Sequence, residues 1–373
     1  MRNQTLKQKV QKLLDRADVQ IDGKRPWDIK VNNEELYPRI LAGGILAVGE
    51  AYMDGWWDCA ALDKLIDRIL RVKWDLKKIL PKHLAWDVLK TKLINKQRKS
   101  RAYEIGKRHY DTGNKLFQLM LDKRMNYSCA YWKNADNLDE AQEAKLALIC
   151  KKLKIEPGMT VLDIGCGWGS LANYIAEKFL AKVIGITVSD KQVTLAREMC
   201  KDLDVEIRYQ DYRDLSDKYD SIVSVGMFEH VGYKNYREFF KVINRSLKDH
   251  GLFLLHTIGG NRPTKSVNPW INKYIFPRGM LPAASQITRA YEGLFKLEDW
   301  HNFGTQYDKT LMAWYHNFNK NWSQIKNFYD ERFRRMWNYY LLTCAGAFRA
   351  RQNQLWQIVL SKIDSPIDYE SVR

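Results

Sequence analysis

The pattern of apolar and polar positions divides the chain into three regions. Residues 1–100 have the apolar spacing of helices, interrupted at residues 41–58 by a glycine-rich piece, LAGGILAVGEAYMDGWWD. From residue 151, short β-branched runs alternate with helical patterns of roughly 10 to 15 residues, which is typical of repeated βαβ units. After residue 258, a proline-marked excursion leads into helices rich in aromatic residues. We therefore expect helices first and a parallel sheet afterwards.

Seven apolar runs predict the strands of this sheet. Five of them follow one another along the chain: TVLDIG, KVIGITV, DVEIRY, SIVSV and GLFLLHTIG. Two later runs, LFKLEDW and QLWQIVLS, predict strands at an antiparallel edge of the sheet. The aromatic segments from Trp270 to Phe348 are expected to cap the carboxyl ends of the strands or to line a cavity.

The composition narrows the class of protein. With 373 residues, 45% hydrophobic, the chain can bury a sizeable core and form two or three folding units. Its six cysteines are scattered without the spacing of a zinc site or a disulfide framework, so we expect no metal. No signal peptide is recognisable, and no segment approaches ~18 uninterrupted apolar residues. The sequence predicts a cytoplasmic protein that is neither secreted nor membrane-spanning.

The net charge of +17 predicts attraction to polyanions, either nucleic acid or an anionic membrane face. The densest basic tract runs from Arg71 to Arg108, with Trp74 and Trp86 among its lysines. This mixture is typical of an interfacial helix. A solvated helix face with a few core-facing apolar residues is the simpler interpretation of the same tract.

The stretch VLDIGCGWGS, residues 161–170, is the first chemical motif. An acidic residue at a strand end, followed by G-x-G-x-G and a helical pattern, lets the backbone approach a nucleoside-bearing ligand. The motif resembles motif I of class I S-adenosylmethionine-dependent methyltransferases; a nicotinamide site or a purely structural turn is the alternative. The predicted cofactor-binding residues of this motif are Val161, Asp163, Gly165, Cys166, Gly167, Trp168 and Gly169.

The next two strands offer further cofactor contacts. After the second strand, Thr187, Ser189 and Gln192 stand where that superfamily commonly has an acidic residue, although Ser189 is also a simple helix N-cap. Asp211, after the third strand, occupies the position at which the superfamily contacts adenine, with Tyr212 beside it.

Two ionisable residues end the fourth and fifth predicted strands. Glu229 lies in GMFEHVG and His256 in LLHTIG, so both should reach the edge of the sheet where substrate meets cofactor. A direct interpretation makes Glu229 a general base. His230 is assigned a secondary or structural role. The fourth strand has no D/N-P-P-Y/F-type motif and no Pro-Cys nucleophile follows it, which argues against nucleic acid as the substrate.

At this point the motifs together resemble those of the cyclopropane-fatty-acyl-phospholipid synthases. The resemblance covers nearly the whole chain, and implies methylene transfer from S-adenosylmethionine to the cis double bond of a phospholipid acyl chain. Ser170 departs from the glycine often seen there. The motifs that carry the resemblance, in order, are GEAYMDGWWD, YSCAYW, VLDIGCGWG, GITVSDKQ, GMFEHVG, LLHTIG, NPWINKYIFP, LMAWY and CAGAFRARQNQLWQ.

The resemblance also implies site residues. It implies that a bicarbonate ion takes the proton lost on ring closure, held by Cys129, Glu229, His256, Tyr307 and the backbone of Ile258. Tyr127 and Ser128 would contact the cofactor. Cys344 is a further active-site candidate, with plain packing as the alternative. The aromatic candidates for stabilising a carbocation are Tyr274, Tyr307, Trp314 and Tyr315, each of which could instead be core.

The expected organisation is an α/β protein of the class I methyltransferase type, with a Rossmann-like mixed sheet. Residues 1–100 would form a smaller, mainly helical, lipid-associated domain, and residues 101–373 the catalytic domain with its acyl-chain-binding insertions. The basic tract predicts peripheral association with the inner face of the membrane, the absence of the nucleic-acid methyltransferase motifs argues against nucleic acid as a partner, and the resemblance implies a homodimer. Two other functions remain open: a methyltransferase of a small soluble acceptor, and a non-catalytic lipid-binding protein.

Overall fold

The computed structural model describes residues 2–72, 114–264 and 266–373, and the chain divides into two compact units. The first comprises residues 1–94, 266–277 and 307–353, and the second comprises residues 95–265, 278–306 and 354–373. The first unit thus joins the N-terminal region to two later segments that the sequence analysis assigned to the catalytic domain. The boundary predicted near residue 100 lies outside the described residues.

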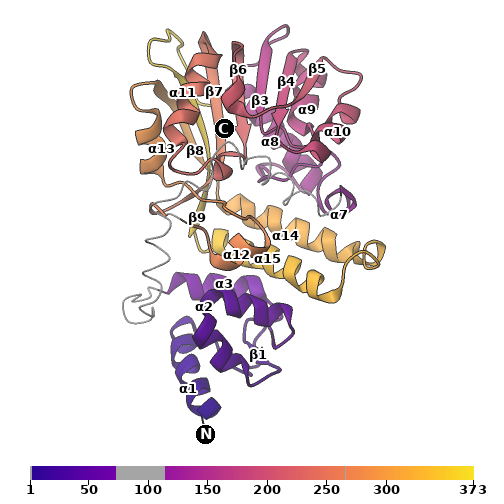
Figure 1. The fold of residues 1–373 in the computed structure, drawn as a ribbon, viewed down its shortest axis with the longest axis vertical. Coiled ribbons are helices and arrows are strands. Elements are labelled where there is room, and N and C mark those ends of the chain that lie inside the picture. Colours follow the sequence, from indigo (N-terminus) through magenta and orange to yellow (C-terminus); the bar gives the residue numbers. More distant parts are fainter. Residues whose placement is uncertain (1, 73–113, 265) are drawn as a thin grey trace. The chain divides into compact units, whose positions relative to one another are not determined.

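The described part of the second unit contains a seven-stranded sheet (Figure 1). Its order is β5-β4-β3-β6-β7-β9-β8; β3 to β7 run parallel, and β8 pairs with β9 antiparallel at the edge. All seven predicted strands are confirmed, as is the mixed α/β class. The strands are β3 (Thr160–Ile164), β4 (Lys182–Thr187), β5 (Val205–Tyr209), β6 (Tyr219–Val225), β7 (Leu247–Gly260), β8 (Phe295–Asn302) and β9 (Asn353–Lys362).

Helices cover both faces of this sheet, so its strands read as nearly continuous apolar runs. Val161 and Val223 pack with α8 (Leu138–Lys152) and α9 (Ser170–Phe179). Leu162 and Ile222, one residue away on the same strands, pack with the helices of the other face. Those helices are α11 (Tyr236–Ser246) and α13 (Ala284–Tyr291), while α7 (Asn114–Met120) and α10 (Asp190–Met199) complete the unit.

The strand order reverses between β3 and β6. The chain proceeds from β3 outward to β4 and β5, then returns to β6 and proceeds the other way to β7. The loops that leave the carboxyl ends of β3 and β6 therefore diverge, and a crevice opens between them.

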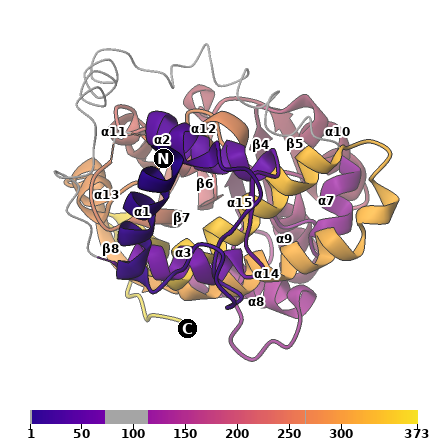
Figure 2. The same cartoon turned by 90° about the horizontal axis from the view of Figure 1, so that it is seen from below.

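The first unit is mainly helical (Figure 2). A short antiparallel ribbon of β1 (Lys30–Val31) and β2 (Trp57–Asp58) was not predicted, because two-residue strands leave no apolar period. In α15 (Glu331–Arg349), Gly346 allows close packing, since a Cβ there would lie 2.5 Å from the Asp63 carbonyl oxygen. The helices are α1 (Arg2–Leu14), α2 (Leu36–Met53), α3 (Leu62–Arg71), α12 (Pro269–Tyr274), most of α14 (Thr305–Lys320) and α15 (Glu331–Arg349).

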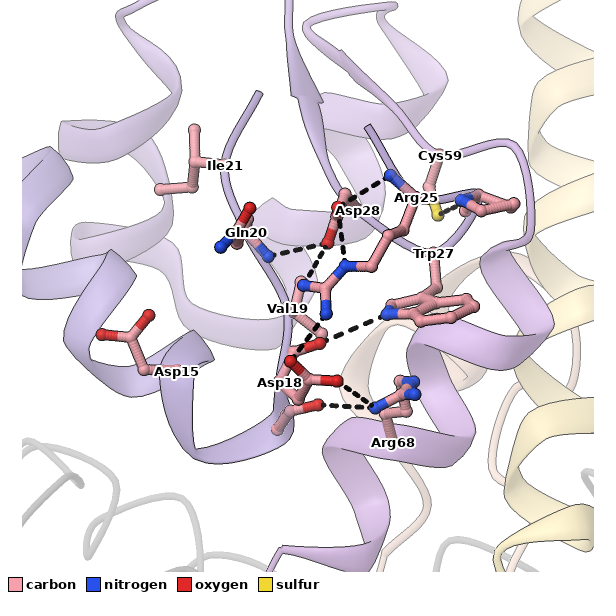
Figure 3. Close-up of polar contacts among 12 residues, drawn as sticks. Asp15, Asp18, Val19, Gln20, Ile21, Arg25, Trp27, Asp28, Cys59 and Arg68 are labelled. Atoms are coloured by element: carbon pink, nitrogen blue, oxygen red, sulfur yellow. Dashed lines mark hydrogen bonds and ion pairs between the residues drawn. The ribbon is translucent and has the colours of Figure 1, made fainter. Parts of the chain in front are cut away.

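An ion-pair network holds the loop between α1 and α2 (Figure 3). The Arg25 guanidinium donates to buried Asp28 at 3.1 and 3.0 Å, and pairs with Asp18 at 2.6 Å. Arg68 of α3 also pairs with Asp18, at 3.0 Å, and its guanidinium carbon lies 4.2 Å from the Trp27 ring centroid. The guanidinium groups of Arg25 and Arg68 thus interact with carboxylates and an aromatic ring of the same unit.

One turn of α2 exposes apolar side chains. Gly44 has a left-handed φ of 58°, which kinks the helix, and the flanking Leu41 and Ile45 are 47% and 60% exposed. No helix in the described part of the chain has the length and apolarity needed to cross a membrane.

Candidate active site

A cavity opens at the carboxyl ends of β3, β4 and β6, beside the strand-order reversal. Most of the predicted cofactor residues line it. Val161 does not, because its side chain is fully buried against α8 and α9; Gly169 instead precedes α9 with a φ of 84°. The predicted residues that line the cavity are Tyr127, Ser128, Asp163, Gly165, Cys166, Gly167, Trp168, Thr187, Ser189, Gln192, Asp211 and Tyr212.

Gly165 explains why the turn after β3 requires glycine. Its φ is 81°, and a Cβ at this position would lie 2.7 Å from the Cβ of Met227, which also lines the cavity. A side chain would therefore be strained and would displace the loop after β6. The glycine keeps the two loops close on either side of the crevice.

Two buried charges face each other at the cavity. Burial raises the pKa of the Asp163 carboxyl to about 7, although the nearby Lys145 ammonium opposes the shift. Burial lowers the pKa of Lys145 to about 8. Within the described residues, the Asp163 carboxylate accepts no side-chain hydrogen bond. It is available to a cationic group of a ligand.

Lys145 and Asn126 are site residues that the sequence analysis missed. The Lys145 ammonium donates to Asn126 Oδ1 at 2.9 Å and to Ser128 Oγ at 3.0 Å. Ser170 Oγ donates to the same Asn126 oxygen at 2.8 Å, and the Asn126 amide donates to Asp122. This buried network fixes the segment that contains Ser128 against α8 and α9.

The spacing of polar residues along α8 could have identified Lys145 as a buried residue. Gln142, Lys145, Ile149 and Lys152 recur at the period of a helix face, and all four are fully buried. Polar residues on the inward face of a helix are expensive to bury without partners. They could have been identified as members of a buried network.

The remaining cavity residues are held by short-range contacts. Thr187 Oγ1 donates to Gln192 Oε1 at 2.8 Å. Ser189 occupies the N-cap position of α10, but its side chain makes no capping hydrogen bond, so the N-cap alternative explains little. The Arg213 guanidinium donates two hydrogen bonds of 2.7 Å to the Asp211 carboxylate. Asp211 and Tyr212 thus sit on a rigid turn after β5.

Glu229 follows β6, the fourth predicted strand, and its carboxylate reaches the end of β7. Its Oε1 accepts the backbone N–H of Ile258 at 2.7 Å. Burial raises the pKa of Glu229 to about 7, against the lowering effect of the Ile258 N–H and the Thr257 hydroxyl. Among the described residues, its buried Oε2 has no hydrogen-bond partner.

His256 lies on β7, opposite Val225 of β6, and is fully buried. Burial, reinforced by the positive charges of Lys145 and Lys152, holds its pKa well below the usual value, so the imidazole is neutral. Its Nδ1 lies 3.3 Å from the amide nitrogen of Gln357, whereas its Nε2 has no partner within the part of the chain that the structure describes. The structure therefore brings the Glu229 carboxylate to the backbone of Ile258, two residues beyond His256 on β7.

The other catalytic candidates are distributed over both units. Cys129 is fully buried in the second unit, where its thiol faces the Ala130 carbonyl at 3.3 Å. Tyr307 belongs to the first unit and packs on Phe348, with ring centroids 4.6 Å apart. Cys344 is also in the first unit, and burial raises the pKa of its thiol to about 12, which disfavours a thiolate.

The comparisons with known proteins agree with this geometry. The family model described as mycolic acid cyclopropane synthetase matches residues 97–358. The cyclopropane-fatty-acyl-phospholipid synthase of Escherichia coli K12 is 55% identical over 353 residues, which cover 94% of this chain and 92% of that enzyme. The chain belongs to the cyclopropane synthase family. The family resemblance is confirmed, and with it the assignment to the methyltransferase class of enzymes.

Two solved structures of the family are similar over the catalytic part. The cyclopropane synthase MmaA2 from Mycobacterium tuberculosis has a TM-score of 0.66 and 30% identity, covering 70% of this chain and 98% of that one. The mycolic acid cyclopropane synthase CmaA1, complexed with SAH and CTAB, has a TM-score of 0.65 and 31% identity, covering 69% and 97%. The alignment with the E. coli enzyme extends further, into most of the region before residue 97.

Proposed function

We propose that the protein transfers a methylene group from S-adenosylmethionine to the cis double bond of a phospholipid acyl chain, forming a cyclopropane. The observation that carries the proposal is a glycine-lined cavity at the carboxyl ends of the strands, together with Glu229 after β6 and His256 on β7, each buried with a polar atom that has no partner among the described residues. The 55% identity with a cyclopropane-fatty-acyl-phospholipid synthase over 94% of the chain supports the lipid substrate.

The cavity residues suit S-adenosylmethionine, which supplies an electrophilic methyl group on a sulfonium. Asp163 offers a buried carboxylate to the cationic part of the cofactor. Thr187, Gln192 and Asp211 offer hydrogen-bonding groups at the ends of the neighbouring strands. The aromatic ring of Tyr212 lies at the same cavity, where it would pack on the adenine ring of the cofactor.

The chemistry requires a base in a buried site, because ring closure removes a proton from the added methyl group. We propose that bicarbonate is this base. Glu229 Oε2 can only accept a hydrogen bond when ionised, and His256 Nε2 can donate one, so together they suit a small guest with both an O–H and an acceptor oxygen. The Ile258 amide already donates to Glu229, which leaves it the role of holding that carboxylate in place. Cys129 and Tyr307 remain predicted members of this site.

One assay tests the reaction. The protein is incubated with methyl-labelled S-adenosylmethionine and vesicles of unsaturated phospholipid, and the acyl chains are analysed for a mass gain of one CH2 group. We expect label in the lipid. Label that enters a soluble amine instead would favour a small-acceptor methyltransferase, and transfer to no acceptor would favour a non-catalytic lipid-binding protein.

We also propose that the protein works as a homodimer at the inner surface of the membrane. The net charge of +17 and the exposed Leu41 and Ile45 support contact with an anionic lipid surface. The basic tract from which this prediction started lies largely outside the described residues. Neutralising Lys96, Arg98, Lys99 and Arg101 should weaken vesicle co-sedimentation, and unchanged binding would remove the tract from the proposal. Sedimentation equilibrium measures the oligomeric state.

A further inference from the structure

His256 has a buried partner to which no role has been assigned so far. Gln357, on β9, is fully buried and places its amide nitrogen 3.3 Å from His256 Nδ1. Its own Oε1 has no partner among the described residues. A fully buried amide with one unsatisfied atom is costly for stability, so a contribution to the site is a natural reason to find it here.

The contact determines where the proton of His256 resides. A neutral imidazole has one N–H and one bare nitrogen, and the hydrogen bond at one nitrogen decides which is which. In the structure the amide nitrogen of Gln357 faces Nδ1, and since an amide nitrogen can only donate, this orientation makes Nδ1 the acceptor. The proton is then on Nε2, the nitrogen without a protein partner.

An amide suits this position better than a carboxylate does. Lys145 and Lys152 already disfavour the imidazolium, and an uncharged glutamine does not counteract them. A carboxylate at this position would accept a hydrogen bond from Nδ1–H, so the single proton of the neutral ring would stay on Nδ1 and Nε2 would be bare. His256 would then present an acceptor where the site requires a donor.

We propose that Gln357 is a positioning residue that holds His256 in the neutral tautomer with its proton on Nε2. The tautomer itself follows from the contact in the free protein. Its importance for turnover rests on the proposed function, in which Nε2–H donates to the base.

The test combines a spectroscopic and a kinetic measurement. The full-length protein is labelled with 15N-histidine, and the tautomers of its seven histidines are read from their ring-nitrogen shifts, with His256→Gln identifying the relevant signals. The wild type should show a protonated Nε2. Gln357→Glu should move the proton to Nδ1, and Gln357→Met should populate both tautomers.

Turnover should follow the tautomer and not side-chain shape. Gln357→Met should lower kcat by about tenfold to a hundredfold, the usual effect of losing an outer partner of a functional histidine. The nearly isosteric Gln357→Glu should lower it further, with KM for S-adenosylmethionine unchanged. Gln354→Met is the matched control, since Gln354 is a buried glutamine on the same strand that bonds Asn302 and Asn261 instead.

Three results would overturn the proposal: a wild-type His256 protonated on Nδ1, an unchanged tautomer in Gln357→Glu, or a kcat in Gln357→Met equal to that of Gln354→Met. The wild-type spectrum decides the first point even where a variant folds poorly. A protonated Nε2 in a wild type that modifies no lipid would leave the positioning role intact and reject the proposed function.

Discussion

The cofactor cavity and the Glu229–His256 site occupy the same edge of one sheet, but their polar groups are satisfied differently. At the cavity, Lys145 and Asn126 bond to each other and to their neighbours and Arg213 donates two hydrogen bonds to Asp211, whereas Asp163 accepts no side-chain hydrogen bond within the described residues. At the Glu229–His256 site, an oxygen of the carboxylate and a nitrogen of the imidazole are buried without a partner among the described residues.

The two regions therefore differ in the free-energy cost of their buried polar groups before a ligand binds. A satisfied network costs little to maintain and holds the cavity rigid before a ligand arrives. An unsatisfied buried group costs roughly 1–3 kcal/mol until something binds it. The first region should therefore control affinity for the cofactor, whereas the second should control the rate of the chemical step.

Glu229→Gln should have the largest effect, and it tests the division directly. The amide keeps the size of the side chain but removes the negative charge that would orient the base. We expect kcat to fall by roughly 10²–10⁴-fold, the range that general acid–base groups contribute, with little change in cofactor affinity measured calorimetrically. Glu238→Gln, an exposed glutamate on α11, is the control. Equal losses of kcat and affinity would return Glu229 to a structural role.

The pH dependence of stability should also change in Glu229→Gln. The pKa of this carboxyl rises from 4.5 when unfolded to about 7 when folded, so the folded state binds the extra proton between these values. Its contribution to the free energy of unfolding is full below the lower value and is lost as pH rises toward 7, on the order of 3 kcal/mol. Urea unfolding of the free protein at pH 5 and pH 8 measures it. We expect a smaller decline in the variant, and identical declines would contradict the buried, unsatisfied state.

Asp163→Asn should affect the other region. The variant removes the buried charge that would face the cationic cofactor. A hydrogen bond to a charged group contributes about 1.5–3 kcal/mol. Calorimetry with S-adenosylmethionine should show an affinity loss of at least about tenfold, with a smaller effect on saturated kcat. Asp202→Asn, at an exposed turn, is the control. A loss confined to kcat would place Asp163 in the chemical step.

Gly165→Ala should have the smallest effect, and Gly158→Ala provides a matched comparison. Both glycines have a φ near 80°, but a Cβ at Gly158 meets nothing within 4 Å, whereas one at Gly165 meets Met227. Each variant should lose about 1–2 kcal/mol of stability from the left-handed backbone. Only Gly165→Ala should also lose cofactor affinity. Equal affinity in both variants would show that the crevice is not shaped by this contact.

The strands and the cofactor turn could be predicted because their signals are local. β-branched runs, a glycine spacing and an acidic strand end are properties of short stretches, and parallel strands bring their carboxyl ends to one edge. For this reason Glu229 and His256 could be placed near each other from sequence positions 27 residues apart. Lys145 was not predicted as a site residue, because its role depends on which face of α8 is buried.

The sequence by itself determined the order of the elements, the cofactor turn and the two ionisable residues at the strand exits, because each depends on residues close together in the chain. Only the tertiary structure decided which polar groups satisfy one another. It grouped residues 266–277 and 307–353 with the N-terminal unit, and it brought Gln357 to His256 across 101 positions of the chain. Burial and hydrogen bonding depend on neighbours in space, and these neighbours set the protonation states of Glu229 and His256.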